Sequence, residues 1–136
     1  MFSVDTTIRV RYAETDQMGV VYHGNYFEYF ECARTESIRQ LGATYNELEK
    51  SGISMPIREV HAKYLRPALY DEMITIKTIL KEMPKGHKVE FHHEVYNDQQ
   101  VLLATGKVVL VFIEIKSQKI TTIPEYLKSK LEPFFI

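Results

Sequence analysis

The residues best suited to chemistry in this sequence are Asp16 and His23, which stand in an expected loop over residues 13–24. A carboxylate can attack an electrophilic carbon or take a proton from water, and an imidazole can exchange protons near neutral pH. A predicted helix begins directly after the loop, so its free N–H groups and the positive end of its dipole point toward these side chains. The segment thus combines an attacking group with a place for an oxyanion or a polarised carbonyl.

The helix that follows the loop is the most strongly indicated element of the chain. Asn25 is a favourable N-cap residue, and Glu28 stands three residues later, as in a capping box. The side chains of one face then recur at helical spacing, at Phe27, Phe30, Arg34, Ile38 and Leu41. Gly42 is a suitable C-terminal stop. The pattern predicts a helix over residues 25–41.

Most of the remaining sequence has the pattern of strands. Apolar runs predict strands over residues 2–12, 53–64, 72–82, 88–96 and 101–115. Turn-forming residues at 84–86 and 97–100 predict antiparallel hairpins between the later strands. Ala104 and Gly106 are small at positions where another element could pack closely against the last strand. A short helical turn is expected over residues 46–52 and a last short helix over residues 125–131.

This order of elements predicts an α+β fold, in which one antiparallel sheet packs on one central helix. The four strands after the helix are expected to form a meander. Several strands are too apolar for a sheet with one wet face, so a second subunit is expected to cover the other face or an edge. No linker or internal repeat divides the sequence, which predicts a single domain over residues 1–136.

Composition limits the classes of partner. The chain is 45% hydrophobic and 26% charged, as globular domains are, and its net charge of −1 provides no global attraction to nucleic acid or to a membrane surface. The single cysteine, Cys32, cannot form an internal disulfide, and the sequence has neither a signal-peptide pattern nor an apolar run long enough to span a bilayer. A cytoplasmic protein is therefore expected.

Three segments carry a resemblance to a known family: YAETD at residues 12–16, GVVYHGNY at 19–26 and ECARTE at 31–36. Together they resemble the signature of hotdog-fold acyl-CoA thioesterases, in the 4-hydroxybenzoyl-CoA thioesterase-like branch and especially its Tol-Pal-associated type. The likeness continues to about residue 115 and includes YLRPA at residues 64–68. It implies a five-stranded antiparallel sheet wrapped around a long helix. It also implies a homodimer with active sites at the subunit interface, often paired into a homotetramer.

The resemblance also implies an activity and a role for each matching residue. The reaction would be hydrolysis of a fatty or aromatic acyl-CoA, in lipid metabolism, to the free acid and CoA. Asp16 would be the nucleophile or the general base, and the backbone N–H of His23 with the helix start would polarise the carbonyl. The side chain of His23 and Tyr12 would be secondary catalytic or positioning groups.

Substrate contacts are expected from the start of the helix and from basic residues on strands. Gly24 and Asn25 stand at the helix start, and Tyr26 could line a tunnel for the acyl group. The phosphates of CoA would meet basic residues on or at the ends of strands, with Lys63, Arg66, Arg58 and Lys88 as candidates. CoA is part of the substrate, so no separate cofactor is expected.

Several of these residues also have a purely structural interpretation. Asp16 could simply form an Asx turn, His23 could hold the loop by a hydrogen bond, and Tyr12 could be an ordinary strand aromatic. His61, His87, His92 and His93 are dispersed, and neighbouring strand residues point to opposite faces, so no metal site is expected. Glu14 and Thr15 are expected to shape the loop.

Two other functions stay open at this level. The same site could cleave acyl groups carried on acyl carrier protein, or the fold could bind an acyl thioester or a protein without turning it over. The sequence lacks both a phosphate-binding Gly-rich loop and a Gly-x-Ser-x-Gly motif, which argues against a P-loop enzyme and an α/β-hydrolase.

Overall fold

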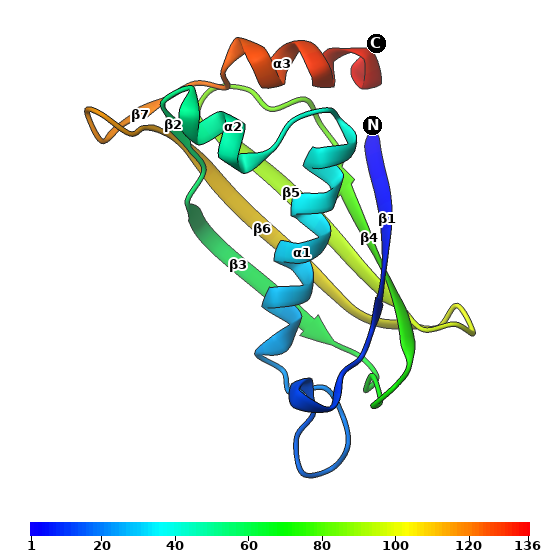
Figure 1. Ribbon diagram of the computed structural model, residues 1–136. Coiled ribbons are helices and arrows are strands. Elements are labelled where there is room, and N and C mark those ends of the chain that lie inside the picture. Colours follow the sequence, from blue (N-terminus) through cyan, green and yellow to red (C-terminus); the bar gives the residue numbers. More distant parts are fainter.

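The computed structural model describes residues 1–136 and has one antiparallel sheet that curls around one long helix (Figure 1). Its strands are β1 (Phe2–Arg9), β2 (Ile53–Ser54), β3 (Ile57–Tyr64), β4 (Met73–Leu80), β5 (Lys88–Tyr96), β6 (Leu102–Glu114) and β7 (Lys119–Thr121). Its helices are α1 (Asn25–Gln40), α2 (Tyr45–Lys50) and α3 (Glu125–Leu131), with 3₁₀ turns η1 (Tyr12–Glu14) and η2 (Glu132–Phe135). The α+β class is as predicted. β7 adds to the five expected strands, and β2 is the first piece of the strand expected over residues 53–64.

The order of the strands differs from the predicted meander. β4, β5 and β6 do follow one another as antiparallel hairpins, but β1 pairs with β4, and β3 pairs with β6. The meander prediction was therefore wrong for β3. The apolar pattern of a strand records which of its faces is buried and does not record its neighbour. Because α1 crosses the sheet between β1 and β3, the chain enters β3 at the far edge, beside β6.

The strand predicted over residues 88–96 has the expected bounds, and the other four predicted strands are shorter or divided. The expected strand over residues 53–64 is divided by Pro56, which has no N–H to donate to a ladder. The carbonyl of Pro56 accepts a hydrogen bond from Val111 at 3.1 Å, so both pieces still follow β6. The first strand ends at Arg9 and the chain turns into η1, which places Tyr12 outside the sheet.

The start of α1 is also built differently from the prediction. Gly24 is the N-cap residue and no side chain caps the helix, so the predicted capping box of Asn25 and Glu28 was wrong. The side-chain amide of Asn25 instead donates to the backbone carbonyl of Glu14 at 2.7 Å. At the other end Gly42 has a φ of 87°, the left-handed conformation that ends a helix, as expected.

The core lies between α1 and the inner face of the sheet. Phe30 is fully buried and packs directly on Gly106 of β6, where an added Cβ would lie 2.4 Å from Cε2 of the phenyl ring. The expectation that small residues of this strand allow a close approach is thus confirmed. The loop before α1 lies at the end of the molecule opposite to α2, α3 and the two termini (Figure 1). No helix combines the length and the apolar character needed to cross a bilayer.

Candidate active site

A hollow of about 380 Å³ opens where the loop, the start of α1 and the end of β3 meet. It brings together four residues that the sequence singled out, namely Asp16, His23, Tyr26 and Arg66. The other residues of its wall are apolar or aromatic: Val20, Val21, Tyr64, Leu65 and Pro67. A short bridge from Thr15 to Val21 closes the loop on itself, and one from Val20 to Leu69 holds it against the chain that follows β3. Backbone pairing therefore fixes the loop beside the hollow.

Asp16 forms the Asx turn that its structural interpretation predicted, and it still has a free oxygen. Its Oδ1 accepts a hydrogen bond from the N–H of Met18 at 2.8 Å, and its backbone N–H donates to Val20 at 2.9 Å. Gly19 closes the turn with a φ of 77°, a conformation that favours glycine. Oδ2 accepts no hydrogen bond from the chain. The turn thus fixes the carboxylate while leaving one oxygen available.

Two backbone N–H groups directly before α1 donate to no group of the chain, those of His23 and Gly24. The next amide, that of Asn25, already donates to the carbonyl of Tyr22 at 2.9 Å. Free amides at the start of a 16-residue helix also feel the positive end of its dipole. These groups are suited to hold an oxygen atom that carries negative charge.

The imidazole of His23 is exposed and lies among aromatic rings. Its ring centroid is 4.3 Å from that of Tyr22 and 6.2 Å from that of Tyr64. The hydroxyl of Tyr64 donates to the backbone carbonyl of His23 at 2.9 Å. Burial raises the pKa of Tyr64, so its hydroxyl keeps its proton and stays a donor at neutral pH. Sequence reasoning gave Tyr64 no role, although it begins the YLRPA segment of the resemblance.

Tyr26 forms the inner wall of the hollow. Its side chain is buried, and its ring meets that of Tyr64 edge to face at a centroid distance of 5.1 Å. Burial raises the pKa of Tyr26 as well. The two rings make a rigid aromatic surface beside the loop of Asp16.

The structure places several other predicted residues outside this hollow. Tyr12 is 78% exposed and lies against Tyr70, at a centroid distance of 5.8 Å, in a shallow depression on another side of Asp16. Gly24 and Asn25 flank the hollow without lining it, and the amide of Asn25 is bonded to Glu14.

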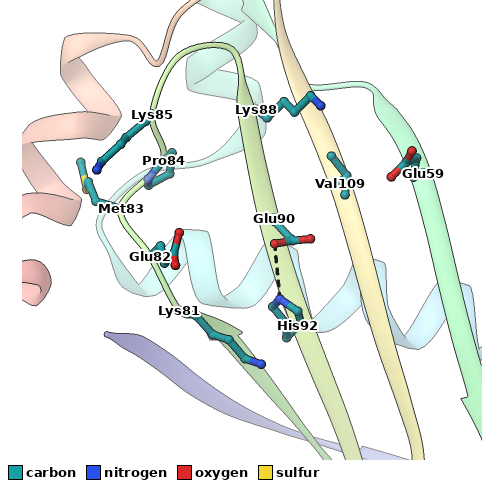
Figure 2. Close-up of a pocket in the computed structure, with 10 residues that line it drawn as sticks. All are labelled: Glu59, Lys81, Glu82, Met83, Pro84, Lys85, Lys88, Glu90, His92 and Val109. Carbon is teal, nitrogen blue, oxygen red and sulfur yellow. Dashed lines mark ion pairs between the residues drawn. The ribbon is translucent and has the colours of Figure 1, made fainter.

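Two of the basic candidates lie on the outer face of the sheet. Figure 2 shows one hollow of this face, of about 390 Å³, with Lys88 among its lining residues. A neighbouring hollow of about 400 Å³ contains Lys63. The carboxylate of Glu90 lies 3.6 Å from His92 and 3.3 Å from Lys107, so this face carries charges of both signs. These lysines are separate from the hollow of Asp16.

Comparisons with known proteins match nearly the whole chain. A family model described as the thioesterase-like superfamily matches residues 10–131. YneP of Bacillus subtilis is 40% identical over 90 residues, which are 66% of this chain and 64% of that protein. The acyl-CoA thioester hydrolase YbgC of Escherichia coli is 30% identical over 118 residues, 87% of each chain. The crystal structure of a DHNA-CoA thioesterase from Staphylococcus aureus has a TM-score of 0.89 and 34% identity, covering 98% of this chain and 89% of that one.

Proposed function

The chain belongs to the thioesterase-like superfamily and has the hotdog fold, and on this basis we propose that it hydrolyses an acyl-CoA to a free acid and CoA. The family and the fold expected from the sequence are thereby confirmed, whereas the Tol-Pal association stays a prediction. One observation supports the activity most directly. Asp16 and one of the two residues with a free amide, His23, line the same hollow.

In the proposed reaction the carbonyl oxygen of the thioester accepts hydrogen bonds from the N–H groups of His23 and Gly24. The free oxygen of Asp16 then either attacks the carbonyl carbon or takes a proton from a water molecule that attacks it. The carbon–sulfur bond breaks, and CoA leaves as a thiolate that gains a proton. In the first route a water molecule then hydrolyses the resulting anhydride, so both routes consume one water and release one acid.

The wall of the hollow supports an apolar acyl group. Tyr26, Tyr64 and Leu65 offer ring faces and aliphatic surface, and Arg66 is the one cation among the lining residues. An aromatic acyl group could stack on these rings, and the Staphylococcus aureus relative is named for such a substrate. Fatty and aromatic acyl groups are both included in the proposal, and the aromatic esters come first in its test. Arg66 is proposed to meet a phosphate of CoA.

The test is thiol release from a panel of short, long and aromatic acyl-CoA esters. Asp16→Asn should lower kcat/KM by about 100-fold or more while the protein stays folded. Asp98→Asn is the matched control, because Asp98 is exposed in the turn between β5 and β6. Equal activity of the wild type and Asp16→Asn would show that Asp16 is not the catalytic residue. A covalent route predicts, after rapid quenching, a protein mass raised by one acyl group.

The same panel decides between the alternatives. If no CoA ester is cleaved and acyl carrier protein thioesters are, the substrate is the carrier-bound acyl group. If neither is cleaved but a thioester binds, the chain is a binding module. The proposed chemistry uses no metal or cofactor, so treatment with a chelator should leave the rate unchanged.

We further propose that the working form is a homodimer that pairs into a tetramer, located in the cytoplasm. β3 is bonded to β6 on one side only, and its other edge is free to pair. Large apolar side chains are exposed around the site, at Tyr12, Met18, Tyr22, Leu69 and Tyr70. Cys32 is exposed and unpaired, which suits a reducing compartment. Light scattering with size exclusion tests the assembly, and a monomer would contradict it.

A further inference from the structure

A second carboxylate, that of Glu14, lies at the start of the loop of Asp16, outside the hollow and largely shielded from solvent. Glu14 is only 7% exposed, yet both of its carboxylate oxygens are fully used. Oε1 accepts from the backbone N–H of Arg11 at 2.8 Å and from the hydroxyl of Tyr29 at 2.9 Å. Oε2 accepts from Nε and Nη2 of Arg11 at 3.2 and 3.1 Å. A buried carboxylate with four donors is a strong and geometrically demanding anchor.

The backbone of Glu14 adds a second anchor. Its carbonyl oxygen accepts from the side-chain amide of Asn25 at 2.7 Å and from the backbone N–H of Tyr22 at 2.9 Å. These donors stand on either side of His23 and Gly24, the residues whose amides are free. Glu14 therefore joins the beginning of the loop to its end and to the helix behind it.

We propose that Glu14 is a positioning residue, which fixes the distance between the carboxylate of Asp16 and the free amides of His23 and Gly24. Asp16 follows Glu14 by two residues, and His23 follows Tyr22 directly, so both halves of the site are tied to the same residue. Small displacements of reacting groups lower rates steeply. This inference depends on the proposed function, since it assigns a role within that reaction.

The hydrogen-bond donors around Glu14 favour a charged acceptor. Burial raises the pKa of the Glu14 carboxyl, but the hydrogen bonds from Arg11 and Tyr29 outweigh it, so the net pKa is lowered and the group is charged at neutral pH. In Glu14→Gln one acceptor oxygen becomes an NH₂ group that faces the donors of Arg11. In Tyr29→Phe a single donor is lost, and the contacts of Arg11 stay.

The chain offers a matched pair at its opposite end. The hydroxyl of Tyr126 donates to Glu47 at 2.5 Å, which is again a tyrosine–glutamate contact but on an exposed surface. Glu47→Gln and Tyr126→Phe therefore make the same chemical changes far from the site. They control for the general effect of each substitution.

The experiment measures kcat and KM of all four variants for the best thioester, at a temperature where each is folded. Glu14→Gln should lower kcat about 10- to 100-fold with KM changed less than about threefold, and Tyr29→Phe should lower kcat about threefold to tenfold. Glu47→Gln and Tyr126→Phe should stay within about twofold of the wild type. A fall in kcat that merely follows the fraction of unfolded protein would overturn the positioning role.

Amide hydrogen exchange supplies a measurement that needs no substrate. The N–H of Tyr22, bonded to Glu14, and that of Asp16, bonded to Val20, should exchange faster in Glu14→Gln and not in Glu47→Gln. Unchanged exchange together with unchanged kcat would overturn the proposal. If the wild type releases no thiol from any ester, the proposed function fails and the catalytic part of this inference fails with it, whereas faster exchange would show only that Glu14 orders the loop.

Discussion

Two groups of polar side chains, each with buried members, contact α1, one at its first turns and the other at its middle. The first is Glu14 with Arg11 and Tyr29, in which each carboxylate oxygen accepts two hydrogen bonds. The second contains Arg34 of α1 and His93 of β5, which are 3% and 1% exposed. Both groups bury a charged or titratable side chain on or against the same helix. A comparison of the two therefore shows how the neighbouring donors and acceptors change the effect of burial.

The second group is far less complete. Nη1 of Arg34 and Nε2 of His93 are buried without a hydrogen-bond partner. Nε of Arg34 donates to the hydroxyl of Tyr45 at 3.1 Å, and Nδ1 of His93 lies 3.1 Å from Oγ1 of Thr78. No carboxylate is paired with the guanidinium of Arg34 in the structure.

The second group is held mainly by the packing of its rings. The ring of His93 stacks on that of Phe30, with centroids 4.8 Å apart and planes 5° from parallel, and Phe30 in turn packs on Gly106. A fully bonded polar group fixes one geometry, whereas a partly bonded group tolerates change as long as the packing is kept. The fully bonded group around Glu14 lies beside the candidate active site. The partly bonded group of Arg34 and His93 lies in the core, where its main task is to fill space.

Replacing the buried carboxylate should have the largest effect on stability. Glu14→Leu should lower the free energy of unfolding by about 3 kcal/mol, because the buried hydroxyl of Tyr29 and the backbone N–H of Arg11 lose their acceptor, whereas the exposed guanidinium of Arg11 can turn to water. Urea unfolding measures the change. Glu47→Leu, at the exposed tyrosine–glutamate contact, should change the stability by less than about 1 kcal/mol. Equal losses would remove the distinction between a buried and an exposed anchor.

The second group should be sensitive to packing. Gly106→Ala should lower the free energy of unfolding by about 2 to 3 kcal/mol, because the new methyl group overlaps the ring of Phe30. In the background of Phe30→Leu the same change should be smaller, since the smaller side chain can move. A double-mutant cycle by thermal or urea unfolding measures this coupling. Additive effects would show that the ring of Phe30 and the side chain at position 106 do not interact.

The two groups should also respond to acid in different pH ranges. Burial lowers the pKa of His93 to about 3, so the unfolded chain binds a proton that the folded chain excludes, and stability falls as pH drops below about 6.5. Between pH 7 and pH 5 the loss should be about 2 kcal/mol. Because the pKa of Glu14 is lowered on folding, its charged form stabilises the folded chain, and this stabilisation is lost only below about pH 4.5.

Unfolding curves at pH 7, 5 and 4 separate these contributions. His93→Phe keeps an aromatic ring on Phe30 and should remove the loss between pH 7 and pH 5. His92→Gln, which changes an imidazole of the outer face, should retain that loss. A wild type whose stability is constant down to pH 5 would contradict the assignment to His93.

The smallest effect is expected for the residue with the least complete bonding. Arg34→Met should change the free energy of unfolding by less than about 1 kcal/mol in either direction, because the substitution removes a buried charge that no anion compensates and keeps much of the apolar volume. Ser37→Ala, at a neighbouring buried position of α1, is the control for a small polar change. A loss of several kcal/mol in Arg34→Met would mean that the guanidinium makes a strongly stabilising interaction.

Local features of this fold could be predicted from the sequence. The spacing of side chains predicted α1, the turn residues predicted the two hairpins, and the small size of Gly106 predicted a close contact, which the structure shows to be with α1. Each of these signals is complete within a short stretch of chain. The partner of β3 is β6, more than forty positions away for most of its residues, and no local pattern contains that information.

The candidate site divides in the same way. Asp16, His23 and the free amides belong to one continuous segment, so their proximity follows from a loop that runs into a helix. Tyr64 reaches the site from the end of β3, and Lys63, beside it in sequence, lies on the outer face because neighbouring strand residues point to opposite sides. Asn25 was misassigned as a cap because its true acceptor, the carbonyl of Glu14, is brought to it by the folded loop.

The position of β6 in the chain has a consequence for how the protein is made. Four other strands pair with β6, yet it is the last of the long strands to leave the ribosome. Until residues 102–114 have emerged, β3 has no partner, and the ring of Phe30 lacks its contact with Gly106. Most of the strand pairs therefore form late, and a nascent chain that stalls before this segment leaves part of the apolar face of α1 exposed to other chains and to chaperones.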